Sequence, residues 1–100
     1  MVKKSIIDTA SRYVKQLPSE LDVKKAYLFG SCAKGLERED SDIDIAIIVG
    51  NMPDFFATQM QLRRLRREID LRIEPHPFSQ ESFAENPFSK EILKTGIKIL

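Results

Sequence analysis

Two aspartates separated by one residue, Asp42 and Asp44, are the side chains of this sequence best suited to chemistry. An apolar run at residues 45–49 follows them directly and is typical of a buried strand. At a separation of ~5 Å and an effective dielectric near ~20, two carboxylates repel each other by about 3 kcal/mol. A divalent cation between them would remove this repulsion, and Mg²⁺ prefers carboxylate and phosphate oxygens. The pair therefore predicts a metal site at the start of a strand.

A glycine–serine bend precedes the acid pair by ten residues. Gly30 and Ser31 end the apolar run 26–29, which belongs to an expected strand at 25–29, and a turn or two of helix is expected from Ser31. Glycine lets the backbone approach a ligand closely, and the first amides of a helix can face an anion. The bend therefore predicts a phosphate site to which the Ser31 hydroxyl adds a hydrogen bond. It is not a Walker loop, because Leu36 stands where that motif has lysine.

A third carboxylate, Asp70, lies in the alternating segment 69–73, which we expect to form a strand beside that of Asp44. Three carboxylates could hold two metal ions, one on the attacking oxygen and one on the leaving phosphates. The alternative is that Asp70 pairs with Arg72, which shares its face of the strand. The next residues, 74–77, are expected to be a rigid loop that exposes His76. Cys32 is expected to be a small filler residue.

The periodicity of the sequence predicts alternating helices and strands. Helices are expected at 5–17, 55–67 and 87–95, with a weak helical turn near 79–85. Ser5 and Asp54 are the expected caps of the first two helices. Strands are expected at 25–29, 43–49 and 69–73, and residues 97–100 could add an edge strand. This order predicts an α/β fold, a small mixed β-sheet with flanking helices, in a single domain at 1–100.

Composition excludes several classes of protein. Sixteen basic against 15 acidic residues give a net charge of +1, which argues against bulk electrostatic binding of nucleic acid. The single cysteine cannot form an internal disulfide and indicates a reducing compartment. No segment approaches the ~20 apolar residues of a membrane span, and the start does not resemble a signal peptide. We therefore expect a cytoplasmic protein with no membrane partner.

The pattern Gly30-Ser31…Asp42-Ile43-Asp44 is similar to the signature of the DNA polymerase β-like nucleotidyltransferase superfamily. The small size and the segment 86–97 resemble its minimal nucleotidyltransferase family, whose members often act as antitoxins of HEPN-type toxins. The resemblance implies the nucleotidyltransferase fold. It also implies roles for named residues. The catalytic and metal-binding residues would be Asp42, Asp44 and Asp70, and the nucleotide-binding residues would be Gly30, Ser31 and Lys34.

The reaction implied is attack of a hydroxyl on the α-phosphate of a nucleoside triphosphate, with pyrophosphate leaving and with two Mg²⁺ ions as cofactors. The acceptor would be a hydroxyl of a helical HEPN-type partner protein, which would be neutralised by AMP taken from ATP. Two alternatives remain. One is a non-catalytic antitoxin that silences its partner by direct contact. The other is a nucleotidyltransferase subunit that acts on RNA or a small molecule. The net charge of +1 argues against RNA as that substrate.

The predicted helix at 55–67 carries a second face of interest. The side chains of Phe56, Met60, Arg63 and Arg67 project within about 60° of one another at 100° per residue, away from the core face. Arginine, methionine and aromatic side chains are enriched in interfaces, so this face is a candidate partner or dimer surface. The alternative is that the C-terminal segment covers Phe56 and water solvates the arginines.

Overall fold

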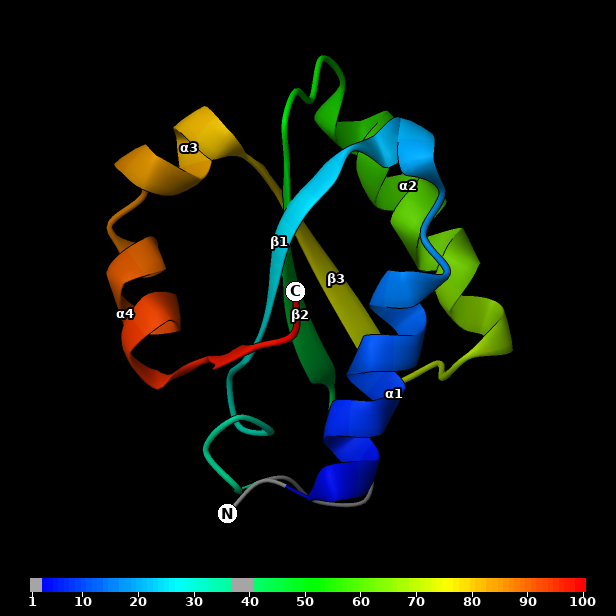
Figure 1. Ribbon diagram of the computed structural model, residues 1–100, viewed down its shortest axis with the longest axis vertical. Helices are drawn as coiled ribbons and strands as arrows, with labels where there is room; N and C mark the ends of the chain where they lie inside the picture. Colours follow the sequence, from blue (N-terminus) through cyan, green and yellow to red (C-terminus); the bar gives the residue numbers. More distant parts are fainter. Residues whose placement is uncertain (1–2, 37–40) are drawn as a thin grey trace.

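The computed structural model describes residues 3–36 and 41–100, and Figure 1 shows a sheet with helices on both faces. The strands of this described part are β1 (Val23–Phe29), β2 (Ile43–Val49), β3 (Ile73–Ser79) and β4 (Ile97–Lys98). Its α-helices are α1 (Lys4–Lys15), α2 (Phe55–Leu65), α3 (Gln80–Glu85) and α4 (Phe88–Thr95). Short 3₁₀ turns, η1 (Ser19–Leu21) and η2 (Arg66–Glu68), follow α1 and α2. No helix in these two ranges is long and apolar enough to cross a membrane.

The four strands form one mixed sheet in the order β3-β2-β1-β4. β1 runs antiparallel to both β2 and β4, while β2 and β3 are parallel. β2 is central, and six of its seven residues are buried, as its uninterrupted apolar sequence predicts. The predicted α/β fold with a small mixed sheet is therefore confirmed, and the bounds of β2 are those predicted.

Two hydrophobic clusters fix the helices to the sheet. α1 and α2 cover one face, and α3 and α4 cover the other (Figure 1). The buried residues of the first cluster include Tyr13, Leu28, Ile45, Ile47 and Leu62. The buried residues of the second are Tyr27, Phe29, Ala46, Ile48 and Ile92. Strand alternation directs the even-numbered side chains of β2 toward α3 and α4, and this is the face on which Asp44 projects.

β3 corrects the sequence prediction. The strand was expected at 69–73 and lies at Ile73–Ser79, so the predicted rigid loop at 74–77 is part of the strand. The carbonyls of Ile73 and Pro75 accept hydrogen bonds from Arg66 and Gln59, and therefore point away from β2. In a strand, the nitrogen of a residue points to the same side as its carbonyl, so the nitrogen of Pro75, and that of Pro77 two residues later, face outward. Because β3 is an edge strand, neither proline removes a hydrogen bond from the sheet.

The helix starts agree with the sequence in part. The Asp54 carboxylate accepts a hydrogen bond from the Ala57 amide at 3.1 Å, which confirms the predicted cap of α2. Ser79 and Ser82 form a capping box at the start of α3. The predicted cap of α1 is wrong, because Ser5 lies inside the helix and Lys3 occupies the cap position without a side-chain hydrogen bond.

Candidate active site

The acid pair lies at the start of β2. Asp42 immediately precedes the strand and is exposed, and the Asp44 side chain is 25% exposed. Ile43 between them is fully buried on the opposite face, so the two carboxylates project on the same side. Among the described residues, no hydrogen bond or ion pair of the Asp42 carboxylate is present. The predicted arrangement of two carboxylates at the mouth of a buried strand is therefore found.

Gly30 lies against the Asp44 carboxylate. β1 pairs with β2 so that Phe29 is opposite Asp44, and Gly30 follows directly. A Cβ atom on Gly30 would lie 2.6 Å from Asp44 Oδ2, and the residue has φ +75°. Both the close approach and the left-handed backbone therefore require glycine at this position. The structure thus brings together two of the sequence-predicted site residues.

The segment after Gly30 is a tight turn and not the predicted helix. The carbonyl of Ser31 accepts hydrogen bonds from the amides of Lys34, at 3.2 Å, and Leu36, at 2.9 Å. Gly35 completes the turn with φ +72°. Ser31 is partly buried and stands next to the glycine that touches Asp44. That the Ser31 hydroxyl binds a phosphate of a nucleotide stays a prediction.

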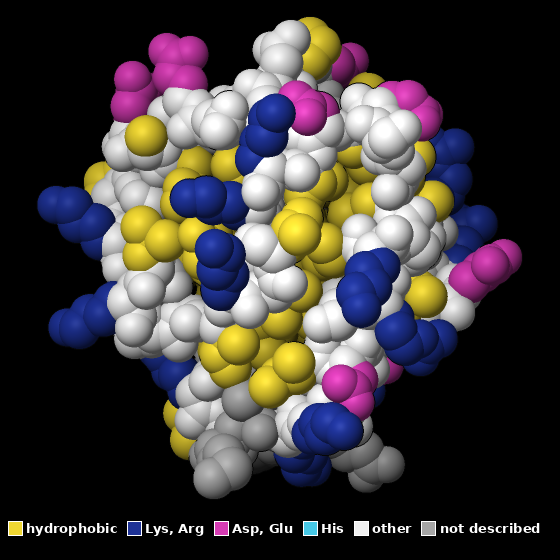
Figure 2. All heavy atoms as spheres, in the orientation of Figure 1, with side chains coloured by type: hydrophobic (Ala, Val, Ile, Leu, Met, Phe, Trp, Pro, Cys, Tyr) yellow, Lys and Arg dark blue, Asp and Glu magenta, His cyan; other side chains and the backbone are white. Residues whose placement is uncertain are grey.

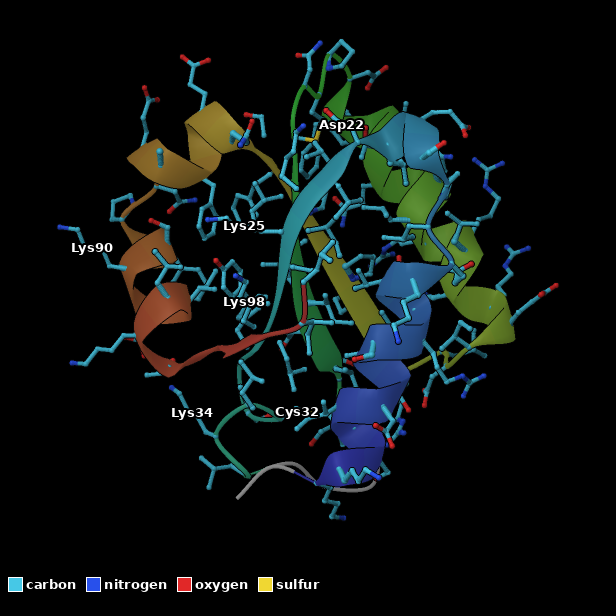
Figure 3. All side chains as sticks on the ribbon, viewed as in Figure 1. Asp22, Lys25, Cys32, Lys34, Lys90 and Lys98 are labelled. Carbon is cyan, nitrogen blue, oxygen red and sulfur yellow. The ribbon has the colours of Figure 1, made fainter. Side chains whose placement is uncertain are left out.

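Cys32 and Lys34 hold this turn on its two sides (Figure 3). Cys32 is 1% exposed, which confirms its expected packing role, and its thiol donates to the Asp42 carbonyl at 3.2 Å. Lys34 Nζ lies 3.7 Å from Glu91 Oε1 on α4, and both side chains are about half exposed. Exposed ion pairs of this kind contribute little stability, so the Lys34 ammonium can exchange Glu91 for another anion. Its predicted contact with phosphate stays a prediction.

His76 is a site residue that the sequence prediction missed. It was expected in an exposed loop, but it lies on β3 beside Ala46 of β2. Its Nε2 atom is 3.0 Å from Asp44 Oδ1, and its ring packs edge-on against Phe29 with centroids 5.0 Å apart. The ring packing and the hydrogen bond together fix the orientation of the Asp44 carboxylate.

Asp70 does not occupy the predicted strand position. β3 begins three residues later, and the Asp70 carboxylate folds back onto Arg72. It accepts hydrogen bonds from the Arg72 side chain, at 2.8 Å from Nη2, and from the Arg72 amide, at 2.9 Å. The Arg72 side-chain hydrogen bond lowers the pKa of the Asp70 carboxyl below its ordinary value. The alternative weighed from the sequence, an ion pair with Arg72, is thus observed.

Glu74 is the carboxylate that pairs in register with Asp44 across the parallel strands. It forms ion pairs with two arginines, Arg63 on α2 and Arg66 on η2, the second at 3.5 Å. Arg66 also donates to the Ile73 carbonyl at 2.9 Å, which holds it at the outer edge of β3. The sequence signal for Glu74 and His76 is their alternation with the two prolines, which puts both polar side chains on one face of a strand.

The donor set fits a magnesium ion that shares its ligands with a substrate. Within residues 3–36 and 41–100, no group of three or more His, Cys, Asp or Glu side chains is placed to hold a metal ion. Mg²⁺ commonly uses one or two protein carboxylates and completes its coordination with water and phosphate oxygens. Asp42 and Asp44 supply the two carboxylates of such a site. A third would require Glu74 to leave its arginines.

The sequence matches a family model described as polymerase beta nucleotidyltransferase over residues 8–100. A comparison with curated proteins gave no significant match. Among solved structures, a candidate nucleotidyltransferase from Sulfolobus solfataricus superposes with a TM-score of 0.66 at 20% identity, covering 94% of this chain and 78% of that chain. A toxin-antitoxin structure with AMP-PNP gives a TM-score of 0.65 at 19% identity, covering 94% and 72%. The toxin-antitoxin MntA-HepT gives 0.58 at 17%, covering 98% and 72%.

The structural likenesses, all at low identity, establish that the nucleotidyltransferase fold predicted from the sequence is correct. The family model covers all of the described strands and both sides of the site, from Asp8 onward. It therefore includes the glycine–serine bend and the acid pair. The chain belongs to the polymerase beta nucleotidyltransferase family.

Proposed function

We propose that this protein transfers AMP from ATP to a hydroxyl of a partner protein, and that the partner is the toxin of a toxin–antitoxin pair. The observation that carries the proposal is the close approach of Gly30 to Asp44, which holds the Gly30–Ser31 bend against the carboxylate pair. Family membership supports nucleotidyl transfer as the class of reaction. The similarity to toxin-antitoxin structures, one of them with AMP-PNP, supports the choice of nucleotide and partner. The chain would then be a minimal nucleotidyltransferase acting as antitoxin.

Asp42 and Asp44 would hold Mg²⁺, which when bound would neutralise the negative charge of the triphosphate. His76 keeps the Asp44 carboxylate in a fixed orientation for this role. Gly30 and Ser31 would contact the phosphates through the backbone and the hydroxyl, and Lys34 would add a positive charge after leaving Glu91. These residues position the α-phosphate beside the two acids.

In the transfer step, the acceptor oxygen bonds to the α-phosphorus, the bond to the pyrophosphate oxygen breaks, and the hydroxyl proton passes to a carboxylate. We assign the proton acceptor to Glu74 because it is in register with Asp44, whereas Asp70 lies before β3 and is bound to Arg72. Glu74 would have to exchange its arginines for the incoming hydroxyl. It would then also be available to a second ion.

The test is transfer of labelled AMP from ATP, with Mg²⁺, to the purified protein encoded by the adjacent gene. Label on that protein should disappear with Asp42→Asn and with Asp44→Asn. It should fall strongly with Glu74→Gln and only weakly with Asp70→Asn. Asp8→Asn, on the exposed side of α1, is the matched control and should transfer normally. Transfer that survives both substitutions of the acid pair would refute the proposal.

One observation favours the non-catalytic alternative. Of the acids at this end of the sheet, Glu74 and Asp70 are both neutralised by arginines of the chain itself. A protein that only binds its partner would tolerate this arrangement. In that case, neutralisation of the toxin would survive Asp42→Asn and Asp44→Asn, although no label would be transferred.

A further inference from the structure

We propose that the outer face of α2 is the surface on which the partner protein docks, and that it receives a segment combining acidic and apolar side chains. We call this surface the α2 stripe; it comprises Phe56, Met60, Arg63 and Arg64 of α2, Arg67 of η2 and the following Leu71. The proposal rests on the proposed function, because it names the surface that would bring the acceptor protein to the acid pair.

The apolar part of the α2 stripe is uncovered. Phe56 is 79% exposed and Met60 is 60% exposed, and Leu71, beyond the end of η2, is 68% exposed. The C-terminal segment does not cover Phe56, because α4 packs on the opposite face of the sheet and β4 pairs with β1 (Figure 1). The explanation weighed from the sequence, a covered Phe56, is therefore wrong.

The charged part of the α2 stripe has more arginines than acids, because Arg63 and the neighbouring Arg66 share one carboxylate, that of Glu74. A depression of about 200 Å³ lies at its lower end. Its lining residues are Met60, Arg63, Arg64, Arg66, Arg67 and Leu71. Arg64 and Arg67 are exposed and form no ion pair within the described ranges, and Arg66 Nε is buried there without a hydrogen-bond partner. Four guanidinium groups around one small depression favour an anionic ligand.

The mixed character of the face favours a protein over a nucleic acid. Arginine, methionine and phenylalanine are enriched in protein interfaces, and hot spots there combine aromatic and arginine side chains. A phosphate backbone offers no apolar group for the exposed side chains of Met60 and Leu71 to pack against. A net charge of +1 gives little sequence-independent attraction to nucleic acid. On the face shown in Figure 2, lysines and arginines are spread among apolar side chains over α1 and α4. The excess of arginines and the exposed apolar side chains of the α2 stripe together favour a protein segment that carries acidic and apolar residues.

The α2 stripe leads to the candidate active site. α2 has 11 residues and is therefore about 16 Å long, with Phe56 at one end and Arg63 near the other. Arg63 contacts Glu74, which lies in register with Asp44. A partner that lies along the stripe would therefore reach the acid pair at the end where the arginines gather.

The test is binding of the purified product of the adjacent gene, measured by isothermal titration calorimetry. The charge variant is Arg64→Glu with Arg67→Glu, and the apolar variant is Phe56→Ala with Met60→Ala. All four side chains are exposed, so both variants should fold, which thermal unfolding verifies. Each should weaken binding at least ~tenfold. The affinity of the unmodified protein should also fall as salt is raised.

The matched control is Lys90→Glu with Lys94→Glu, which makes the same change of charge on exposed positions of α4. It should bind within about twofold of the unmodified protein. Equal binding by all variants would overturn the docking surface, as would no binding by the unmodified protein. A single-stranded RNA oligonucleotide is the second probe. RNA binding that depends on Arg64 and Arg67, with partner binding unaffected, would also overturn the proposal.

The acid-pair variant Asp42→Asn separates the two proposals. If it binds normally but transfers no AMP, both stand. If the stripe variants lose binding but even the unmodified protein transfers no AMP, the docking surface stands and the proposed function fails. If transfer depends on Asp42 while the stripe variants bind normally, the function stands and the docking surface fails.

Discussion

Replacing Gly30 by alanine tests the contact on which the candidate active site depends. The new Cβ atom would lie 2.6 Å from Asp44 Oδ2, whereas ordinary contact begins at 3.4 Å. The carboxylate would have to move by about 0.8 Å, which is the difference between these distances. That movement would also disturb its hydrogen bond to His76.

Two effects of this substitution can be given magnitudes. A left-handed backbone costs an L-residue roughly 1–2 kcal/mol, and Gly30 has φ +75°. In a domain of this size, 1 kcal/mol corresponds to a fall in Tm of about 4–8 °C. A misplacement of about 1 Å in a catalytic group can lower a rate by about 10²-fold. We therefore expect a modest loss of stability and a loss of AMP transfer of about that size.

Gly35→Ala is the matched control, because Gly35 has φ +72° and lies in the same turn. It should show a similar fall in the free energy of unfolding, measured with guanidinium chloride, and a much smaller loss of transfer. The difference between the two variants isolates the contact with Asp44. If Gly30→Ala transferred AMP as fast as Gly35→Ala, the reasoning about this contact would be refuted.

Two further predictions concern stability and pH. Tyr13 is buried and its hydroxyl donates to the Leu62 carbonyl at 2.6 Å, so Tyr13→Phe should lower the free energy of unfolding by about 1 kcal/mol. Burial raises the pKa of the Tyr13 hydroxyl above its ordinary value. Above about pH 10 the unfolded state therefore ionises first, and the folded state loses stability. In urea titrations over that range, the free energy of unfolding of Tyr13→Phe should fall less than that of the unmodified protein. Hydrogen bonds from Arg72 lower the pKa of the Asp70 carboxyl, so its stabilising effect is present above about pH 4 and is lost as pH falls below it. Asp70→Asn should flatten the acid limb of the stability curve, and an unchanged limb would contradict the role of this ion pair.

Much of the fold follows from local pattern. The uninterrupted apolar run of β2 predicts a central strand, and the predicted bounds, Ile43–Val49, are those observed. The start of α2 was predicted from Asp54, whose carboxylate makes the expected bond. The start of α1 was not, because the helix begins one residue before Ser5, at Lys4, and its first two residues are exposed and make no side-chain cap that fixes the boundary.

The third strand could not be placed from periodicity alone. The alternation at 69–73 has the period of a strand, but its residues form a turn held by Asp70 and Arg72. The prolines at 75 and 77 argued against a strand, and only the sheet order reveals that this strand is at an edge and can accept them. The consequence reaches the site, because Glu74 and His76 were assigned to a loop. Side-chain partners separated by many residues, such as Arg63 with Glu74, carry no local signal.

The two prolines of β3 also limit how this protein can associate. A strand at the border of a sheet normally offers a row of amide donors to which a strand of another molecule can add. Here Pro75 and Pro77 lack those donors, and Gln59 and Arg66 already occupy the carbonyls of Pro75 and Ile73. Self-assembly by lengthening the sheet at this border is therefore blocked, which protects the chain from amyloid-like stacking there. A complex that forms at this border must instead use side chains.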